Sequence, residues 1–388
     1  MPPHELPVPD AAALATSAAL AARIREDIAR AGGWIGFDRY MDLALHAPGL
    51  GYYAAGARKF GAGGDFVTAP ELGPLFARTL ARQVAELFGH APAHVLELGA
   101  GSGALAVELL EELSALGTSP ASYSILETSA SLRERQRERL GAQDRAADTH
   151  VEWLDALPAR FSGVVIANEV ADAIPVRAVA WTQEGLVERG VTFADDAFAW
   201  ADRPASPGLA AAAESLGIGI PGGGRYESEI GLAARAWMSS LCAMLEQGAL
   251  IVADYGFPRR EYYHPQRSMG TLMCHYRHRS HGDVFLWPGL QDLTAHVDFT
   301  TLAEAAHDAG LDILGYAPQA SFLAECGLVD VLARYDASDV RAYAPRAAEA
   351  HTLMSPAEMG ELFKVLAVGR GVPRPALGFR RGDRTGML

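Results

Sequence analysis

The chain has 388 residues, of which 49% are hydrophobic and 21% are charged. This composition predicts a globular protein of about two domains, because disordered chains lack the apolar residues that offset the entropy lost on folding. The net charge of −14 argues against a nucleic-acid partner, whose phosphates require clustered lysine and arginine.

The three cysteines, Cys242, Cys274 and Cys326, are widely spaced and form no C-x-x-C motif. This predicts a reducing compartment without disulfides or a zinc ribbon. No run of about 18 apolar residues occurs, so no membrane span is expected. The first residues lack the basic-then-apolar order of a secretory signal, and the cytoplasm is therefore the predicted location.

Residues 1–90 are predicted to form an N-terminal helical and loop extension. After a loose tail at 1–10, apolar periodicity indicates helices at 11–30, 37–45 and 75–88. A glycine-rich stretch at 49–74 separates the second of these helices from the third. Such a density of glycine favours sharp bends or a close approach of the backbone to a ligand.

From residue 94, short apolar strands alternate with amphipathic helices. Strands are predicted at 94–98, 123–126, 151–154, 164–167, 249–253 and 311–316. This alternation predicts an α/β fold with a parallel sheet. The predicted division is a core at 91–177 and 225–330, an insertion with a hairpin at 178–224, a lid or substrate loop at 257–299, and a C-terminal extension with a basic tail at 331–388.

The strongest local signal is the segment Glu97–Gly103, E-L-G-A-G-S-G, between a predicted strand and a helix. Glycine turns in this context bind nucleotide cofactors, and the spacing also satisfies a loose dinucleotide pattern. Glu97 would repel a pyrophosphate but suits the sulfonium and ammonium of S-adenosylmethionine. The sequence therefore favours S-adenosylmethionine over NAD, with the turn residues Gly99, Ala100, Gly101 and Gly103 lining the cofactor.

Acidic residues follow the next two predicted strands. Glu127 ends the strand at 123–126, where it can accept both ribose hydroxyls, as a carboxylate also does in NAD enzymes. Thr128 comes next. Asp155 follows the third strand and is a candidate acceptor for the adenine amino group.

A second candidate site begins at Asn168, where the apolar strand at 164–167 ends. Asn168, Glu169 and Asp172 are predicted to face the transferable methyl group, although helix capping is an alternative role. A guanidinium nucleophile is protonated at pH 7, and carboxylates can hold it bidentately. Glu169 together with Asp172 or Glu227 could do this, whereas a catechol or enolate substrate would favour a metal or a basic side chain.

The combination of motifs resembles the MidA-like S-adenosylmethionine-dependent methyltransferases. The shared motifs are Gly51–Tyr53, Gly64–Glu71, Glu97–Gly103, Leu126–Ser129, Asn168–Val176, Arg225–Glu227, Ala253–Gly256 and Asp292–Phe299. The resemblance implies a Rossmann-like class I core with an antiparallel edge and extra elements over the active site. It also implies methylation of an exposed arginine on a protein, with a respiratory-complex subunit as one candidate partner.

Further roles follow from the same resemblance. The Gly64–Glu71 loop is expected to close over the cofactor through Asp65, Thr68 and Pro70. The candidate substrate-binding residues in the shared motifs and adjoining loop are Tyr52, Tyr53, Glu227, Tyr255, His275 and His296.

The histidines at 275, 278 and 281 could suggest metal ligands. Arg277 and Arg279 lie between them and oppose a cation, so a lid or partner-docking role is preferred and no metal is expected. His296 could line the cleft or cap the helix predicted at 301.

Three functions remain open. The first is a protein arginine methyltransferase, the second is a small-molecule methyltransferase, and the third is a cofactor-binding assembly chaperone with little turnover. A dehydrogenase is disfavoured by Glu97.

Overall fold

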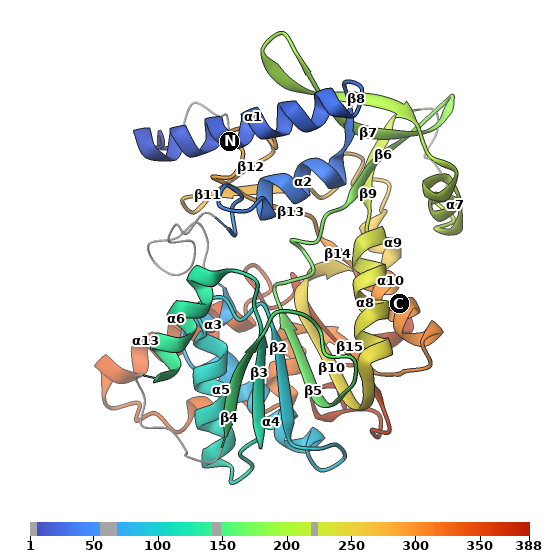
Figure 1. Ribbon diagram of the computed structural model, residues 1–388. Helices are drawn as coiled ribbons and strands as arrows, with labels where there is room; N and C mark the ends of the chain where they lie inside the picture. Colours follow the sequence, from blue (N-terminus) through green and yellow to red (C-terminus); the bar gives the residue numbers. More distant parts are fainter. Residues whose placement is uncertain (1–5, 55–67, 142–148, 219–223) are drawn as a thin grey trace. The chain divides into compact units, whose positions relative to one another are not determined.

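The computed structural model describes residues 6–54, 68–141, 149–218 and 224–388. The chain forms two compact units, each built from separate stretches of sequence (Figure 1). Unit 1 contains Met1–Phe66, Asp172–Arg235 and Phe257–Asp298, and unit 2 contains Val67–Ala171, Ala236–Gly256 and Phe299–Leu388.

Unit 2 is organised around a mixed sheet with the strand order β15-β16-β10-β5-β2-β3-β4. The strands are β2 (His94–Leu98), β3 (Ser122–Leu126), β4 (His150–Leu154), β5 (Phe161–Asn168), β10 (Leu245–Phe257), β15 (Asp312–Pro318) and β16 (Phe363–Arg370). The pairs from β10 to β4 are parallel, while β16 runs antiparallel to both β10 and β15. The predicted α/β fold with a parallel sheet and an antiparallel edge is thus confirmed.

Helices connect these strands and follow them. They are α3 (Ala69–Leu72), α4 (Leu75–Leu87), α5 (Ala104–Ala115), α6 (Ala130–Gly141), α10 (Phe299–Asp308), α11 (Gln319–Glu325), α12 (Leu328–Leu332) and α13 (Val340–Met354). α8 (Leu232–Met244) leads into β10. The short turns Leu377–Phe379 and Thr385–Met387 close the chain.

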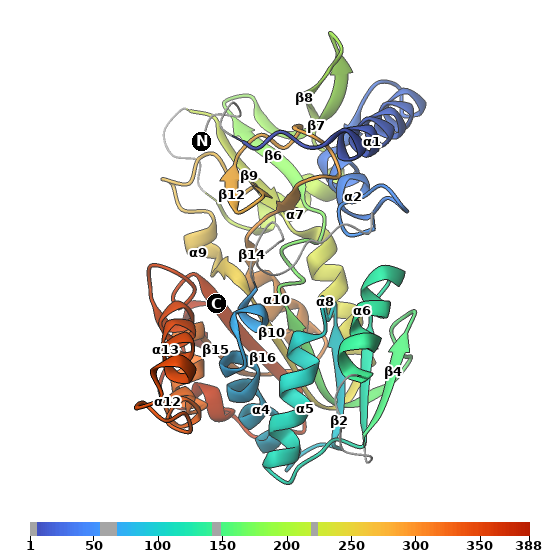
Figure 2. The ribbon, with the colours of Figure 1, turned by 90° about the vertical axis from the view of Figure 1, so that its left-hand side faces the viewer.

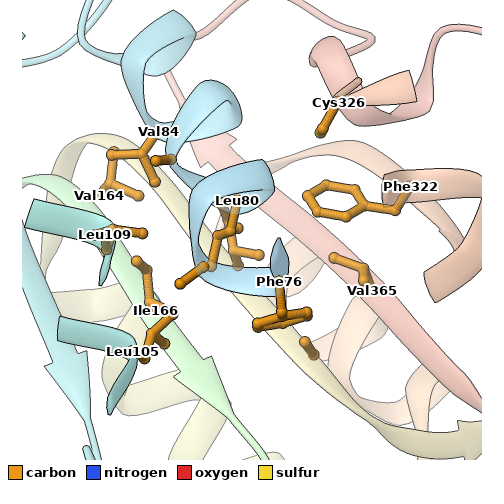
Figure 3. Close-up of a cluster of buried hydrophobic side chains, with 14 of the residues drawn as sticks. Phe76, Leu80, Val84, Leu105, Leu109, Val164, Ile166, Phe322, Cys326 and Val365 are labelled. Carbon is orange, nitrogen blue, oxygen red and sulfur yellow. The ribbon is translucent and has the colours of Figure 1, made fainter. Parts of the chain in front are cut away.

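The core of unit 2 forms where α4 and α5 lie side by side against the sheet (Figure 2). Figure 3 shows Leu80 of α4 and Leu109 of α5 beside Ile166 of β5. The four residues Val164–Ala167 of β5 are at most 1% exposed, so both faces of this strand are covered. This explains why β5 reads as a continuous apolar run rather than an alternating one.

The strand order places a topological switch point between β2 and β5. β2 continues on one side to β3 and β4, whereas β5 continues on the other side to β10. Open α/β sheets bind ligands at the carboxyl ends of the strands that flank such a point. Gly99 follows β2 and Glu169 follows β5, so the topology brings the two predicted sites to the same edge.

The described residues of unit 1 form two smaller sheets. The first has the order β1-β7-β6-β9 with β8 paired to β7, and the second has the order β12-β11-β13. The strands are β1 (Ile35–Gly36), β6 (Arg177–Thr182), β7 (Gly185–Ala194), β8 (Ala197–Pro204), β9 (Tyr226–Ile230), β11 (Met273–Tyr276), β12 (Arg279–His281) and β13 (Asp292–Thr294). The helices are α1 (Ala11–Arg30), α2 (Phe37–His46), α7 (Pro207–Ser215) and α9 (Arg259–Tyr262).

The two units divide the chain differently from the predicted segments. The helix predicted at 75–88 is α4, and it belongs to the core of unit 2 rather than to an N-terminal extension. The segment predicted as a C-terminal extension supplies β16, which is inserted between β10 and β15. The predicted basic tail contributes to the core, because Phe379 is fully buried and its ring lies 5.2 Å from that of Phe322.

Candidate active site

The glycine turn between β2 and α5 has an unusual backbone. Gly99, Gly101 and Gly103 all have positive φ, at 63°, 52° and 82°. Side chains at such angles are strained, which explains why glycine occupies all three positions. A Cβ on Gly99 would lie 3.2 Å from Val170 Cγ2, so the turn is packed closely against the loop that follows β5.

Glu97 lies on β2 just before the turn and is 2% exposed. The Tyr123 hydroxyl donates a hydrogen bond of 2.7 Å to its Oε2. The pKa of Glu97 is raised from 4.5 to about 7, chiefly by burial; the hydrogen bond from Tyr123 opposes this shift and the charge of the nearby Glu127 adds to it. Two buried carboxylates that interact electrostatically thus lie beside the turn.

The raised pKa of Glu97 predicts a dependence of stability on pH. Between pH 4.5 and about 7, Glu97 is mostly protonated in the folded protein and mostly ionised in the unfolded chain. Its contribution to the free energy of unfolding is therefore fully present at acidic pH and is lost as the pH rises to about 7. Without cofactor, the free energy of unfolding should decrease between pH 5 and pH 8 by about 2 kcal/mol less in Glu97→Gln than in the unsubstituted protein. Urea titrations at each pH measure this difference.

The control for this measurement is Glu134→Gln, because the Glu134 side chain is 67% exposed on α6. Its pH profile should match that of the unsubstituted protein. If the free energy of unfolding of Glu97→Gln depends on pH as it does in the unsubstituted protein, the buried Glu97 carboxylate does not titrate as described.

Glu127 is the centre of a buried hydrogen-bond network. Its Oε1 accepts from the Ser129 amide at 2.9 Å, and its Oε2 accepts from Gln136 Nε2 at 3.2 Å. Burial raises the pKa of Glu127, and the donors around the carboxylate, including the Thr128 amide, lower it. The carboxylate predicted to hold the ribose is therefore fixed in place.

Gln136 is a site residue whose importance the sequence did not reveal. It is fully buried, its Nε2 also donates to the Gly101 carbonyl at 2.9 Å, and its Oε1 accepts from Trp153 Nε1 at 2.9 Å. Gln136 thereby connects the glycine turn, Glu127 and β4. In the sequence, Gln136 lies four residues after Leu132 and four before Leu140, and a polar residue between two leucines at helical spacing is the signal that could have revealed it.

Asp155, the candidate adenine acceptor, lies close to the same network. Its side chain is 91% exposed and forms an ion pair of 2.7 Å with Arg133. Arg133 also donates to the carbonyl of Leu154 at 2.7 Å and to the carbonyl of Glu127. The structure thus brings Asp155 near Glu127 through Arg133, and its contact with adenine stays a prediction.

Glu169 stands at the exit of β5 with φ 53°, a left-handed conformation that is rare for a residue other than glycine. Its Oε1 accepts from the Ala69 amide and from Asn168 Nδ2, both at 3.1 Å. The predicted catalytic pair Asn168 and Glu169 is therefore in direct contact. Asp172 is the first residue of the next stretch of unit 1, where its carbonyl accepts from the Ala295 amide at 3.0 Å.

The loop predicted to close over the cofactor is described only from Thr68 onward, and Asp65 lies outside the described residues. Thr68 and Pro70 form the start of α3, whose first amide, that of Ala69, reaches Glu169. Glu71 of α3 also forms a hydrogen bond with Ser102 of the glycine turn. α3 is thus joined both to the turn and to the loop after β5.

Tyr52 and Tyr53, candidate substrate contacts, belong to unit 1. Their rings meet edge to face at 5.1 Å, and Tyr52 is 2% exposed. The Tyr53 hydroxyl donates to Asp292 Oδ1 at 2.9 Å. Burial raises the pKa of Tyr53 well above its ordinary value, so this hydroxyl remains a donor. Their role toward a substrate stays a prediction.

Glu227 in unit 1 is already engaged with two guanidinium groups of the chain. Its Oε1 accepts from Arg225 at 2.6 Å and its Oε2 accepts from Arg189. Arg225 also pairs with Asp202 at 2.8 Å. A substrate arginine would have to displace one of these partners to reach Glu227, which makes Glu169 the better candidate of the two.

The other substrate candidates have defined surroundings. Burial lowers the pKa of His275 on β11, and the nearby His281 lowers it further by a smaller amount. The His296 ring stacks on Phe257 at 5.1 Å within unit 1. Tyr255 belongs to unit 2, where its ring meets Phe363 at 5.5 Å. Their contacts with a substrate also remain predictions.

The histidine-rich segment forms a tight hairpin between β11 and β12, with positive φ at Arg277 and His278. His281 pairs with Cys274, so His275, the next residue along β11, points to the opposite face. Across the described ranges, no group of three or more His, Cys, Asp or Glu is arranged to hold a metal ion. In the same ranges, no helix has the length and apolar character needed to span a bilayer.

The groups around the turn fit S-adenosylmethionine better than a dinucleotide. In their ionised forms, the buried carboxyl groups of Glu97 and Glu127 would repel a pyrophosphate and would be stabilised by a sulfonium and an ammonium. Residues 77–317 match the model of a family described as "putative S-adenosyl-L-methionine-dependent methyltransferase". The chain belongs to this family. The predictions of a methyltransferase and of its cofactor are therefore confirmed.

A solved structure resembles this methyltransferase over nearly its whole length. The crystal structure of a Burkholderia thailandensis protein bound to S-adenosyl-homocysteine shares 54% sequence identity, with a TM-score of 0.94 and coverage of 99% of this chain and 100% of that one. A native structure of a Burkholderia thailandensis protein gives 52% identity and a TM-score of 0.92 over the same shares.

Curated relatives of the methyltransferase carry a more specific name. The protein arginine methyltransferase NDUFAF7 of Danio rerio is 30% identical over 87% of this chain and 83% of its own length. The human protein of that name is 27% identical over 85% and 78%. These relatives are named mitochondrial, which overturns the prediction of a cytoplasmic location. Composition and cysteine content indicate how reducing a compartment is, and they do not identify the compartment.

Proposed function

We propose that this methyltransferase transfers a methyl group to an arginine nitrogen of a protein substrate. The observation that carries the proposal is the position of the Glu169 carboxylate at the switch point of the sheet. It accepts a hydrogen bond from the first amide of α3, and the strand that it follows, β5, is the neighbour of β2, which leads into the glycine turn. The curated arginine methyltransferases that the chain resembles support the same acceptor.

The chemistry required of the protein is mainly alignment. S-adenosylmethionine supplies an electrophilic sulfonium methyl when it is bound. The Glu169 carboxylate would hold the substrate guanidinium by charge-assisted hydrogen bonds and draw positive charge away from the attacking nitrogen. Glu97 and Glu127 would orient the cationic and ribose parts of the cofactor, so that nucleophile, carbon and sulfur lie in line.

For the partner, we propose a protein with an exposed arginine, and a respiratory-complex subunit is the first candidate. The MidA-like resemblance of the sequence supports this choice. The net charge of −14 would favour association with a basic arginine-bearing segment.

Tritiated S-adenosylmethionine added to the purified protein and a cell lysate tests the proposal. We expect a labelled protein band that is absent from the same lysate without added enzyme, and its label should be released as methylarginine on acid hydrolysis. Label confined to the small-molecule fraction would contradict arginine transfer. Cofactor binding without any transfer would instead support the assembly-chaperone alternative.

A further inference from the structure

The left-handed backbone of Glu169 needs support from its surroundings, because this conformation is sterically unfavourable for a residue with a Cβ. The support comes from β10, the neighbour of β5 in the sheet. The Glu169 amide donates to the Ala253 carbonyl at 2.8 Å. The next two amides of the loop bind the following residue of β10.

That residue is Asp254, which is fully buried. Its Oδ2 accepts from the amide of Val170 at 3.1 Å and from that of Ala171 at 2.8 Å, and its Oδ1 accepts from the Tyr255 amide at 2.9 Å. Three consecutive amides of the loop after β5 are thus held by two consecutive residues of β10. A neutral side chain could not accept as strongly from two amides with one oxygen.

A buried carboxylate is costly unless a positive charge lies nearby. Asp254 of β10 lies directly opposite Lys364 of β16 in the antiparallel register of the two strands. Directly opposed side chains share one face of a sheet, with Cβ atoms about 5 Å apart. Lys364 is one of only two lysines in the sequence and is 4% exposed, with its ammonium donating to the Glu361 and Leu362 carbonyls.

We propose that Asp254 is the positioning residue for Glu169 and that Lys364 keeps Asp254 charged. The carboxylate of Asp254 fixes the amides of Val170 and Ala171, which in turn hold Glu169 in its left-handed conformation. Val170 also packs against the glycine turn, so the same carboxylate sets the distance between the loop and the turn. The inference about catalysis rests on the proposed function, in which Glu169 binds the substrate guanidinium.

The test compares Asp254→Asn with the unsubstituted protein by hydrogen–deuterium exchange and by steady-state kinetics. We expect the amides of Val170 and Ala171 to exchange at least tenfold faster. We expect kcat to fall at least 30-fold, while the Kd for S-adenosyl-homocysteine changes less than threefold. In a Glu169→Gln background, Asp254→Asn should lower kcat no further, because both changes remove the same function.

Glu112→Gln is the matched control, since Glu112 is also a buried carboxylate of unit 2 and pairs with Arg334 at 2.8 Å. It should leave both the exchange at 168–171 and kcat unchanged. If Asp254→Asn does not fold, Lys364→Gln is the second variant. In Lys364→Gln we expect the amides of Val170 and Ala171 to exchange at least threefold faster.

Unchanged exchange of these amides in Asp254→Asn would overturn the positioning role. If Asp254→Asn does not fold, unchanged exchange in Lys364→Gln would overturn it instead. Independent, additive losses of kcat in the double variant would overturn the link to Glu169. If the unsubstituted protein transfers no methyl to arginine, the proposed function fails, whereas the exchange measurement still decides whether Asp254 holds the loop.

Discussion

Replacing Gly101 with valine should abolish binding of S-adenosylmethionine while the protein stays folded. Gly101 has φ 52°, which is strained for a β-branched side chain, and its carbonyl is held by Gln136. The added side chain would also keep the turn from close contact with a ligand. Isothermal titration should show at least a 100-fold loss of affinity, and circular dichroism should show retained secondary structure.

Gly117→Val is the matched control for this experiment. Gly117 also has a positive φ, of 70°, but a Cβ there would meet no atom within 4 Å. This variant should suffer a similar backbone strain and bind the cofactor normally. Equal affinities for the Gly101 variant and the control would show that the turn does not contact the cofactor.

Replacing Glu169 with glutamine should lower kcat by a factor of about 10² to 10³, the loss typical when one group that stabilises charge in the transition state is removed from an active site. The amide oxygen can still accept from the Ala69 amide, so the junction with α3 should survive. Only the negative charge that would hold the guanidinium is removed. Label transfer from S-adenosylmethionine measures the rate, and titration with S-adenosyl-homocysteine should show a nearly unchanged Kd.

The surface variant Glu134→Gln controls for loss of a carboxylate elsewhere in unit 2 and should keep the full rate. Wild-type turnover in Glu169→Gln would mean that another group binds the acceptor. Glu227 would then become the next residue to test, despite its bonds to two arginines.

The parts of the fold that depend on local sequence could be predicted. The strand before Gly99 is a short, mainly apolar segment interrupted by Glu97, and the buried strand before Asn168 is a continuous apolar run; both appear within a few residues of their predicted bounds. The turn was also recognisable, because its glycines have to adopt positive φ. Local patterns therefore sufficed to place the two halves of the site at one sheet edge.

Features that depend on distant residues could not be predicted. Nothing near residue 363 indicates that β16 pairs with β10, more than 100 positions earlier in the chain. The support of Glu169 by Asp254 likewise joins the loop after β5 to a residue of β10 that is 84 positions beyond Val170. Gln136 looked like an ordinary helix residue until its three partners were known. Such contacts require the tertiary structure.

The late position of β16 also affects how the protein is made. β10 is complete by residue 257, but the strand that covers its outer edge begins only at Phe363. A chain emerging from the ribosome would therefore expose an apolar strand edge during synthesis of more than 100 residues, and such edges promote aggregation. Closure of this sheet depends on contacts of high sequence separation, which slow folding, so newly made chains should be natural clients of molecular chaperones.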